Sequence, residues 1–198
     1  MAEISATLVK ELRERTGVSM MECKKALAET GGDLDKAADH LRKMGAAAAA
    51  KKADRAANQG LVDSYIHPGG RIGVLLEVNC ETDFVARTDD FKALVHNLAM
   101  HVAASRPQWV RREDVPAAVL DKEREIYRGQ MQHEGKPANI VDRIVEGKLG
   151  KFYEENCLLE QPYVRDPDRK ISQVVQEAIG KIGENIVVRR FSRFELGA

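Results

Sequence analysis

The sequence lacks an excess of charge of either sign, because 31 Lys and Arg residues balance 31 Asp and Glu residues over 198 positions. Surfaces that bind nucleic acid or anionic membranes usually carry a clear basic excess. Here adjacent basic residues come in pairs and not in longer runs. We therefore expect neither direct nucleic-acid binding nor membrane binding.

Cysteine is scarce, and long apolar runs are missing. Cys23, Cys80 and Cys157 are widely spaced and form no Cys-x-x-Cys motif, which argues against a disulfide framework and against structural zinc. No apolar run approaches the roughly 18 residues that a membrane span needs. The opening residues show neither a secretory signal nor a transit peptide. The expected location is the cytoplasm.

Motifs for nucleotide or catalytic chemistry are also missing. There is no phosphate-binding Gly-x-x-x-x-Gly-Lys-Ser/Thr loop, no Gly-x-Ser-x-Gly elbow and no His-Glu-x-x-His helix. Cys80 with a histidine could form a reactive thiolate pair, but a cysteine at the end of a strand is more often buried and structural. We expect no cofactor, no metal and no enzymatic catalysis.

Residues 1–45 contain three short stretches with apolar residues at helical spacing, separated by turn and capping signals. Helices this short cannot bury their apolar faces alone, so they should pack as a three-helix bundle. The Ala-rich residues 46–59 have high helix propensity but few large apolar groups, and predict a helical linker. The signals are Thr16–Gly17, Ser19 with Glu22 as a capping box, Gly31–Gly32, Asp33 as a cap, and Gly45 just past the third helix.

From residue 60 onward, the sequence predicts an α+β domain that extends to residue 198. Two β-rich runs at 61–67 and 71–79 flank a Pro-Gly-Gly turn and indicate a hairpin. Helices are expected over 91–102, from near Pro116, from Pro137, and over 171–182 up to Gly183. The two middle helices, separated by Gly135, predict a helical hairpin. Residues 186–196 predict a strand with one buried face, which either a second copy or a covering helix could use. The fold class is therefore α+β, a small antiparallel sheet packed with helices.

The polar segment after the second β run is the least ordinary part of the sequence. A core strand would not continue into Glu81, Thr82 and Asp83, so the chain must turn there and present Asp83 and Phe84. Two interpretations are open. Phe84 anchors a partner, or it fills the core beneath a turn that Asp83 caps.

Two further positions raise the same question. At most one of Met20 and Met21 can point inward from the first turn of its helix, which leaves the other to a partner; alternatively, both are partly buried. His101 lies at the edge of the apolar stripe of the 91–102 helix, where a histidine is more often a satisfied surface residue than a ligand.

Two segments, LRERTGVSMMECKKAL at 12–27 and EVNCETDFVAR at 77–87, resemble the signature segments of the translation elongation factor Ts family. Further likeness runs through 101–107 and 182–191, and the chain is similar to the short, single-core type. The resemblance implies a guanine nucleotide exchange factor for elongation factor Tu, with an N-terminal module similar to ubiquitin-associated (UBA) domains. It also implies a homodimer formed through the sheets, and thus a two-plus-two complex. The implied partner-binding residues are Met20, Met21, Thr82, Asp83, Phe84, Val85 and His101.

Two other functions stay open on the sequence. The bundle of residues 1–45 could be a UBA-like protein-interaction module without exchange activity. The chain could instead be an RNA-binding translation accessory that uses Arg111, Arg112, Arg189 and Arg190.

Overall fold

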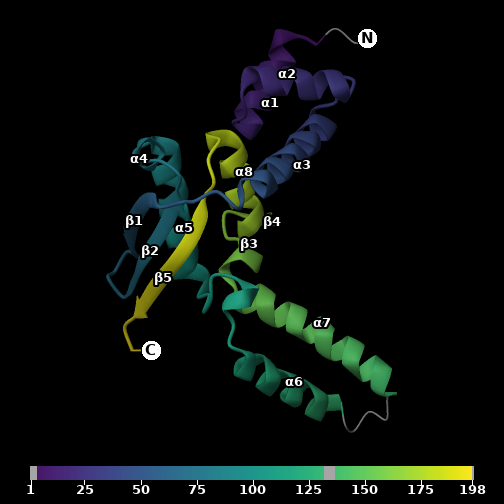
Figure 1. The fold of residues 1–198 in the computed structure, drawn as a ribbon, viewed down its shortest axis with the longest axis vertical. Coiled ribbons are helices and arrows are strands. Elements are labelled where there is room, and N and C mark those ends of the chain that lie inside the picture. Colours follow the sequence, from purple (N-terminus) through teal and green to yellow (C-terminus); the bar gives the residue numbers. More distant parts are fainter. Residues whose placement is uncertain (1–3, 132–136, 198) are drawn as a thin grey trace. The chain divides into compact units, whose positions relative to one another are not determined.

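The computed structural model describes residues 4–131 and 137–197. Within these ranges the chain is mixed α/β, which confirms the expected fold class (Figure 1). No helix in the described ranges is both long and apolar enough to cross a bilayer. The elements are α1 (Ala6–Thr16), α2 (Met20–Glu29), α3 (Leu34–Lys52), β1 (Gln59–Ile66), β2 (Ile72–Cys80), α4 (Asp83–Ala86), α5 (Asp89–Ser105), η1 (Arg112–Asp114), α6 (Ala117–Met131), α7 (Ala138–Asn156), η2 (Leu158–Glu160), β3 (Pro162–Tyr163), β4 (Asp166–Lys170), α8 (Ile171–Ile182) and β5 (Val187–Glu195).

The main sheet has three strands in the order β1-β2-β5, and β3 pairs with β4 in a second, two-stranded sheet. The predicted hairpin is confirmed. The backbone N–H of His67 donates to the carbonyl oxygen of Ile72 at 2.9 Å, and Gly69 and Gly70 take the positive φ values that this turn requires. The N–H of Leu196 donates to the carbonyl of Arg71 at 2.8 Å, so β5 runs antiparallel to β2.

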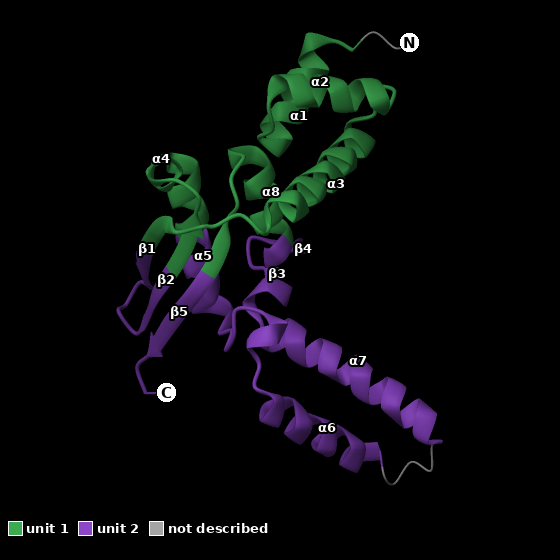
Figure 2. Cartoon of the chain, viewed as in Figure 1, with its two compact units in different colours: residues 1–62, 77–95, 173–188 green, residues 63–76, 96–172, 189–198 purple. Residues whose placement is uncertain are grey.

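The chain divides into two compact units, which are coloured separately in Figure 2. Unit 1 comprises residues 1–62, 77–95 and 173–188. Unit 2 comprises residues 63–76, 96–172 and 189–198.

The N-terminal part of unit 1 is the predicted three-helix bundle. Gly17 ends α1 in the left-handed conformation at φ 68°, and the Ser19 and Asp33 side chains cap α2 and α3 as expected. At the start of α2 the Ser19 hydroxyl accepts from the N–H of Glu22 and donates to its carboxylate at 2.7 Å. The buried core consists of Val9, Leu12, Cys23, Ala26, Leu27, Ala37 and Leu41.

The expected end of the third helix at Gly45 is wrong, because α3 continues to Lys52. The Ala-rich sequence after Gly45 has a high helix propensity, which outweighs the roughly 1 kcal/mol cost of one internal glycine. Gly45 also serves a packing role. A Cβ built on Gly180 of α8 would lie 3.2 Å from the Cα of Gly45, so the missing side chains let α3 and α8 approach closely.

In unit 2, α6 and α7 pack together as the expected helical hairpin. Gly135, which was expected to separate them, lies outside the described residues. Buried Val145 and Leu149 mark the inner face of α7. The β3–β4 pair was not predicted, since its polar sequence with two prolines has no strand pattern.

The single buried face expected for the last strand is only partly present. Ile186 and Val188 are buried, but Phe194 is 68% exposed and Leu196 65% exposed. The Arg193 guanidinium donates to the carbonyl of Ala103 in α5 at 3.1 and 3.2 Å. Within unit 2, Arg193 therefore faces α5, and the neighbouring Phe194 faces away from it.

Candidate functional site

The turn between β2 and α5 presents Phe84 to solvent. Thr82 precedes the one-turn helix α4, and its hydroxyl accepts from the N–H of Val85 at 3.4 Å. Phe84 is 79% exposed, whereas Ala86, two residues further on, is buried against the protein. The interpretation of Phe84 as a core plug is therefore wrong, because the small Ala86 takes that inner position.

The turn is held by the loop between α8 and β5, also in unit 1, which the sequence analysis did not identify. One carboxylate oxygen of Glu184 accepts from the N–H groups of Glu81 and Thr82, both at 3.0 Å. Its other oxygen accepts from the Thr82 hydroxyl at 2.6 Å. The available signal was the family likeness at 182–191, but more than 100 residues separate the partners, and nothing in the sequence pairs them.

Two other side chains at the turn, Asp83 and Cys80, make local contacts. Asp83 pairs with Arg87 at 2.9 Å, one helical turn apart and largely exposed, so the pair contributes little stability. The Cys80 thiol donates to the carbonyl of Thr82 at 3.2 Å. Burial, reinforced by the nearby Glu184 carboxylate, raises the pKa of Cys80. The thiol is thus buried and protonated, as expected for a structural cysteine.

Met20 and Met21 lie in the first turn of α2, also in unit 1. Met20 is 44% exposed and Met21 77% exposed, so the interpretation that both are partly buried does not hold for Met21. The inward positions of α2 belong to Cys23, Ala26 and Leu27. Both thioether side chains are therefore available at the surface, where flexible apolar groups suit a partner interface.

His101 does not lie at the surface, contrary to the expectation for a residue at the edge of a stripe. It is fully buried in unit 2, where its Nε2 lies 3.0 Å from the side-chain oxygen of Gln161. Its Nδ1 accepts from the N–H of Val164 at 3.3 Å. Burial lowers the pKa of His101, so the ring is neutral and structural in the free chain. The Thr82–Val85 turn and the two methionines belong to unit 1, whereas His101 belongs to unit 2.

Two of the four arginines that the RNA-binding alternative would use already pair with carboxylates of this chain. Arg112 makes a bidentate ion pair with Glu160 at 2.7 and 2.8 Å, and Arg111 lies 3.5 Å from a carboxylate oxygen of Asp114. A guanidinium that already pairs with a carboxylate has less charge to offer a phosphate. Two of the four proposed cations are therefore weak candidates.

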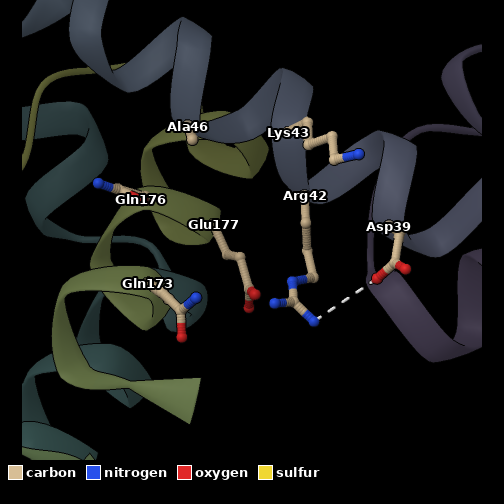
Figure 3. A pocket seen from close by; sticks show the side chains of 7 residues that line it. All are labelled: Asp39, Arg42, Lys43, Ala46, Gln173, Gln176 and Glu177. Atoms are coloured by element: carbon tan, nitrogen blue, oxygen red, sulfur yellow. Dashed lines mark ion pairs between the residues drawn. The ribbon is translucent and has the colours of Figure 1, made fainter. Parts of the chain in front are cut away.

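A hollow of about 350 Å³ opens between α3 and α8 within unit 1 (Figure 3). Its lining carries both charge signs, and Arg42 and Asp39 pair across one helical turn at 3.7 Å. A lining of mixed charge favours neither an anionic nor a cationic ligand. Among the described residues, no group of three or more His, Cys, Asp or Glu side chains could hold a metal ion. The lining residues are Asp39, Arg42, Lys43, Ala46, Gln173, Gln176 and Glu177.

Comparison with known proteins gives a consistent result over nearly the whole chain. A family model described as "Elongation factor TS" matches residues 3–197. A protein named Elongation factor Ts from Thermoanaerobacter sp. (strain X514) is 65% identical over 194 residues, which cover 98% of this chain and 95% of the relative. Its namesake from Anaeromyxobacter sp. (strain Fw109-5) is 62% identical over 197 residues, covering 100% and 90%.

Proposed function

Because the chain belongs to the elongation factor Ts family, a family of translation elongation factors, we propose that it promotes GDP release from elongation factor Tu. The observation that carries the proposal is Phe84, a large apolar side chain that is 79% exposed on a fixed turn. An exposed aromatic ring is stabilised by burial in a partner, and such rings dominate the energetics of many interfaces.

The proposed mechanism is differential binding and involves no covalent step. An exchange factor binds the nucleotide-free GTPase more tightly than the GDP-bound form, and the coupling is reciprocal. If the factor weakens GDP binding a thousandfold, the coupling free energy is about 4 kcal/mol. In this proposal Phe84 enters the GTPase beside its magnesium and phosphate site, while Thr82, Asp83 and Val85 hold the turn that carries the ring.

Met20 and Met21 provide a second contact in the same proposal. They are exposed at the start of α2, in the same compact unit as the turn. Two contacts on one unit add affinity without an additional ordering cost for each. His101 stays a predicted interface residue, but because it is buried it would act only through the atoms that cover it.

We also propose that two copies of the chain pair through the outer face of the main sheet, which would give a two-plus-two complex with the GTPase. Within unit 2 this face exposes Ile66, Leu75 and Phe194 at 63%, 50% and 68%. A Cβ on Gly73 would lie 3.1 Å from the Cδ1 of Ile66, so Ile66 shares a face with Gly73 and with Leu75 two residues on. Large apolar side chains gathered on one exposed sheet face are typical of interfaces.

The test of the exchange function is the release of fluorescent GDP from elongation factor Tu, measured with increasing amounts of the protein. We propose that the protein works in the cytoplasm, so the assay uses a buffer of cytoplasmic pH and salt. We expect the release rate to rise to a plateau as the protein concentration increases. A rate equal to spontaneous release at all concentrations would refute the function.

The second candidate function is a UBA-like interaction module formed by residues 1–45, joined by the linker 46–59 to the domain 60–198. The exposed Met20 and Met21 are compatible with it. The two functions separate cleanly in the full chain. An interaction module would bind its partner equally well with Phe84→Ala, and neither protein would alter GDP release.

A further inference from the structure

We propose that Glu184 is a positioning residue for the Phe84 turn, holding it in the conformation that enters the GTPase before the partner arrives. This inference rests on the proposed exchange function and concerns a residue outside the expected partner-binding set. Glu184 follows α8 and lies about a hundred positions from the turn in sequence, yet it makes three hydrogen bonds to the turn's first two residues.

The turn cannot be stable by itself. Helix α4 has four residues, and a single helical turn is far below the length at which an isolated helix forms in water. Phe84 does not anchor it either, because this side chain is 79% exposed and buries little within the chain. Beyond the buried Ala86 and the bond from the Thr88 hydroxyl to the Val85 carbonyl at 2.8 Å, the conformation of the turn depends on contacts at its N-terminal end.

Glu184 supplies those contacts in one group. Its two carboxylate oxygens accept from the backbone of Glu81 and Thr82 and from the Thr82 hydroxyl. The same hydroxyl accepts from the N–H of Val85 and so caps α4. The carboxylate fixes the direction of the hydroxyl hydrogen, which leaves a lone pair of the oxygen for Val85. Glu184 thus acts on the helix through Thr82, and hydrogen bonds linked in this way reinforce one another.

The backbone that carries Glu184 is held in place by the next residue, Asn185. Asn185 is buried, and its backbone N–H donates to the carboxylate of Glu81 at 2.6 Å. Its side-chain amide donates to the carbonyl oxygens of Ala53 at 3.3 Å and Arg55 at 2.8 Å. Glu81 and the 184–185 pair therefore bond reciprocally, and the segment after α3 is tied to the same point. All of these residues belong to unit 1.

A positioning role has a kinetic signature that differs from that of the ring. Without Glu184 the turn samples other conformations, and the apparent affinity falls in proportion to the population of the competent one. Once bound, Phe84 is still present and still acts. Loss of Glu184 should therefore raise the half-saturating concentration of the factor in the GDP-release assay while the plateau rate stays unchanged.

The test compares Glu184→Ala, Glu184→Gln and the control Glu125→Gln, which alters an exposed carboxylate on α6. We expect Glu184→Ala to raise the half-saturating concentration about tenfold or more, which corresponds to a competent population of about one tenth. Glu184→Gln should lie between it and the wild type, because the amide retains one acceptor oxygen. Glu125→Gln should match the wild type.

A local structural readout accompanies the kinetics. Hydrogen exchange at the amides of Glu81 and Thr82 should accelerate in both Glu184 variants, while the amide of Leu98 in α5 keeps its protection. Should Glu184→Ala fail to fold, Glu184→Gln carries the test, together with Thr82→Val, which removes only the hydroxyl.

The outcomes separate the two proposals. A wild-type protein that does not accelerate GDP release refutes the exchange function, whatever the variants do. An active wild type together with folded Glu184 variants of unchanged half-saturation overturns the positioning role alone. A lower plateau with unchanged half-saturation also overturns it, since Glu184 would then act in the exchange step itself.

Discussion

Replacing Phe84 with alanine should abolish most of the exchange activity without affecting the fold. The ring is 79% exposed, so about four fifths of the roughly 200 Å² of a phenylalanine side chain is free to be buried in a partner. At about 25 cal/mol per Å², full burial is worth about 4 kcal/mol. Alanine keeps the Cβ, so the loss on truncation is about 3 kcal/mol.

This loss sets the size of the kinetic effect. At about 1.4 kcal/mol per factor of ten, the plateau rate of accelerated GDP release should fall roughly a hundredfold. The stability of the chain itself should change by less than about 0.5 kcal/mol, because an exposed side chain contributes little to folding. Alanine is also a better helix former than phenylalanine, which favours α4 slightly.

The assay is stopped-flow release of fluorescent GDP from elongation factor Tu, with circular dichroism and urea unfolding as controls for the fold. Ile126→Ala is the matched variant, since it truncates another exposed apolar side chain, 43% exposed, on α6. It should release GDP at the wild-type rate. A folded Phe84→Ala protein with an undiminished plateau would show that the ring does not carry the exchange step.

Three further predictions follow from the exposed methionine, the outer sheet face and the buried histidine. Met21→Ser should weaken binding to elongation factor Tu severalfold with no change in the urea midpoint, since Met21 is 77% exposed; equal affinity in a titration would remove it from the interface. Phe194→Glu should convert a dimer into a monomer in light scattering, and an unchanged mass would contradict pairing through the sheet. His101 has a lowered pKa, so the unfolded chain takes up a proton first as pH falls below about 6.5; native stability should therefore decrease between about pH 7 and pH 5. In urea unfolding, His101→Gln should reduce this slope, and an identical slope would show that another group causes it.

Local signals in the sequence were sufficient for most of the secondary structure. Glycines that end helices, Ser19 and Asp33 as caps, and the Pro-Gly-Gly turn act through neighbouring atoms, so a single chain segment contains the cause and the effect. The same reasoning failed at Gly45. There the local stop signal competes with the strong helix propensity of the alanines that follow and with close packing against α8.

At the candidate site too, local sequence predicted some features and the tertiary structure decided others. The residues after β2 are polar enough to require a turn, and the likeness of 77–87 to a family signature identified Asp83 and Phe84. Whether Phe84 points outward depends on which side chain fills the space beneath the turn, and that residue is Ala86. His101 was expected at the surface but is buried, again because of residues distant in the sequence. Its polar ring is compatible with the interior only because Gln161 and Val164, about 60 residues away, satisfy both nitrogens.

The sequence by itself determined most of the elements, the bundle, the hairpins and the family, because periodicity, capping and signature segments are properties of contiguous residues. Only the tertiary structure decided which side chains face outward and what holds the turn. Burial and hydrogen bonding depend on partners that are distant in the chain. The hydrogen bonds from Glu81 and Thr82 to Glu184 join segments more than 100 residues apart, and no local sequence pattern predicts such a contact.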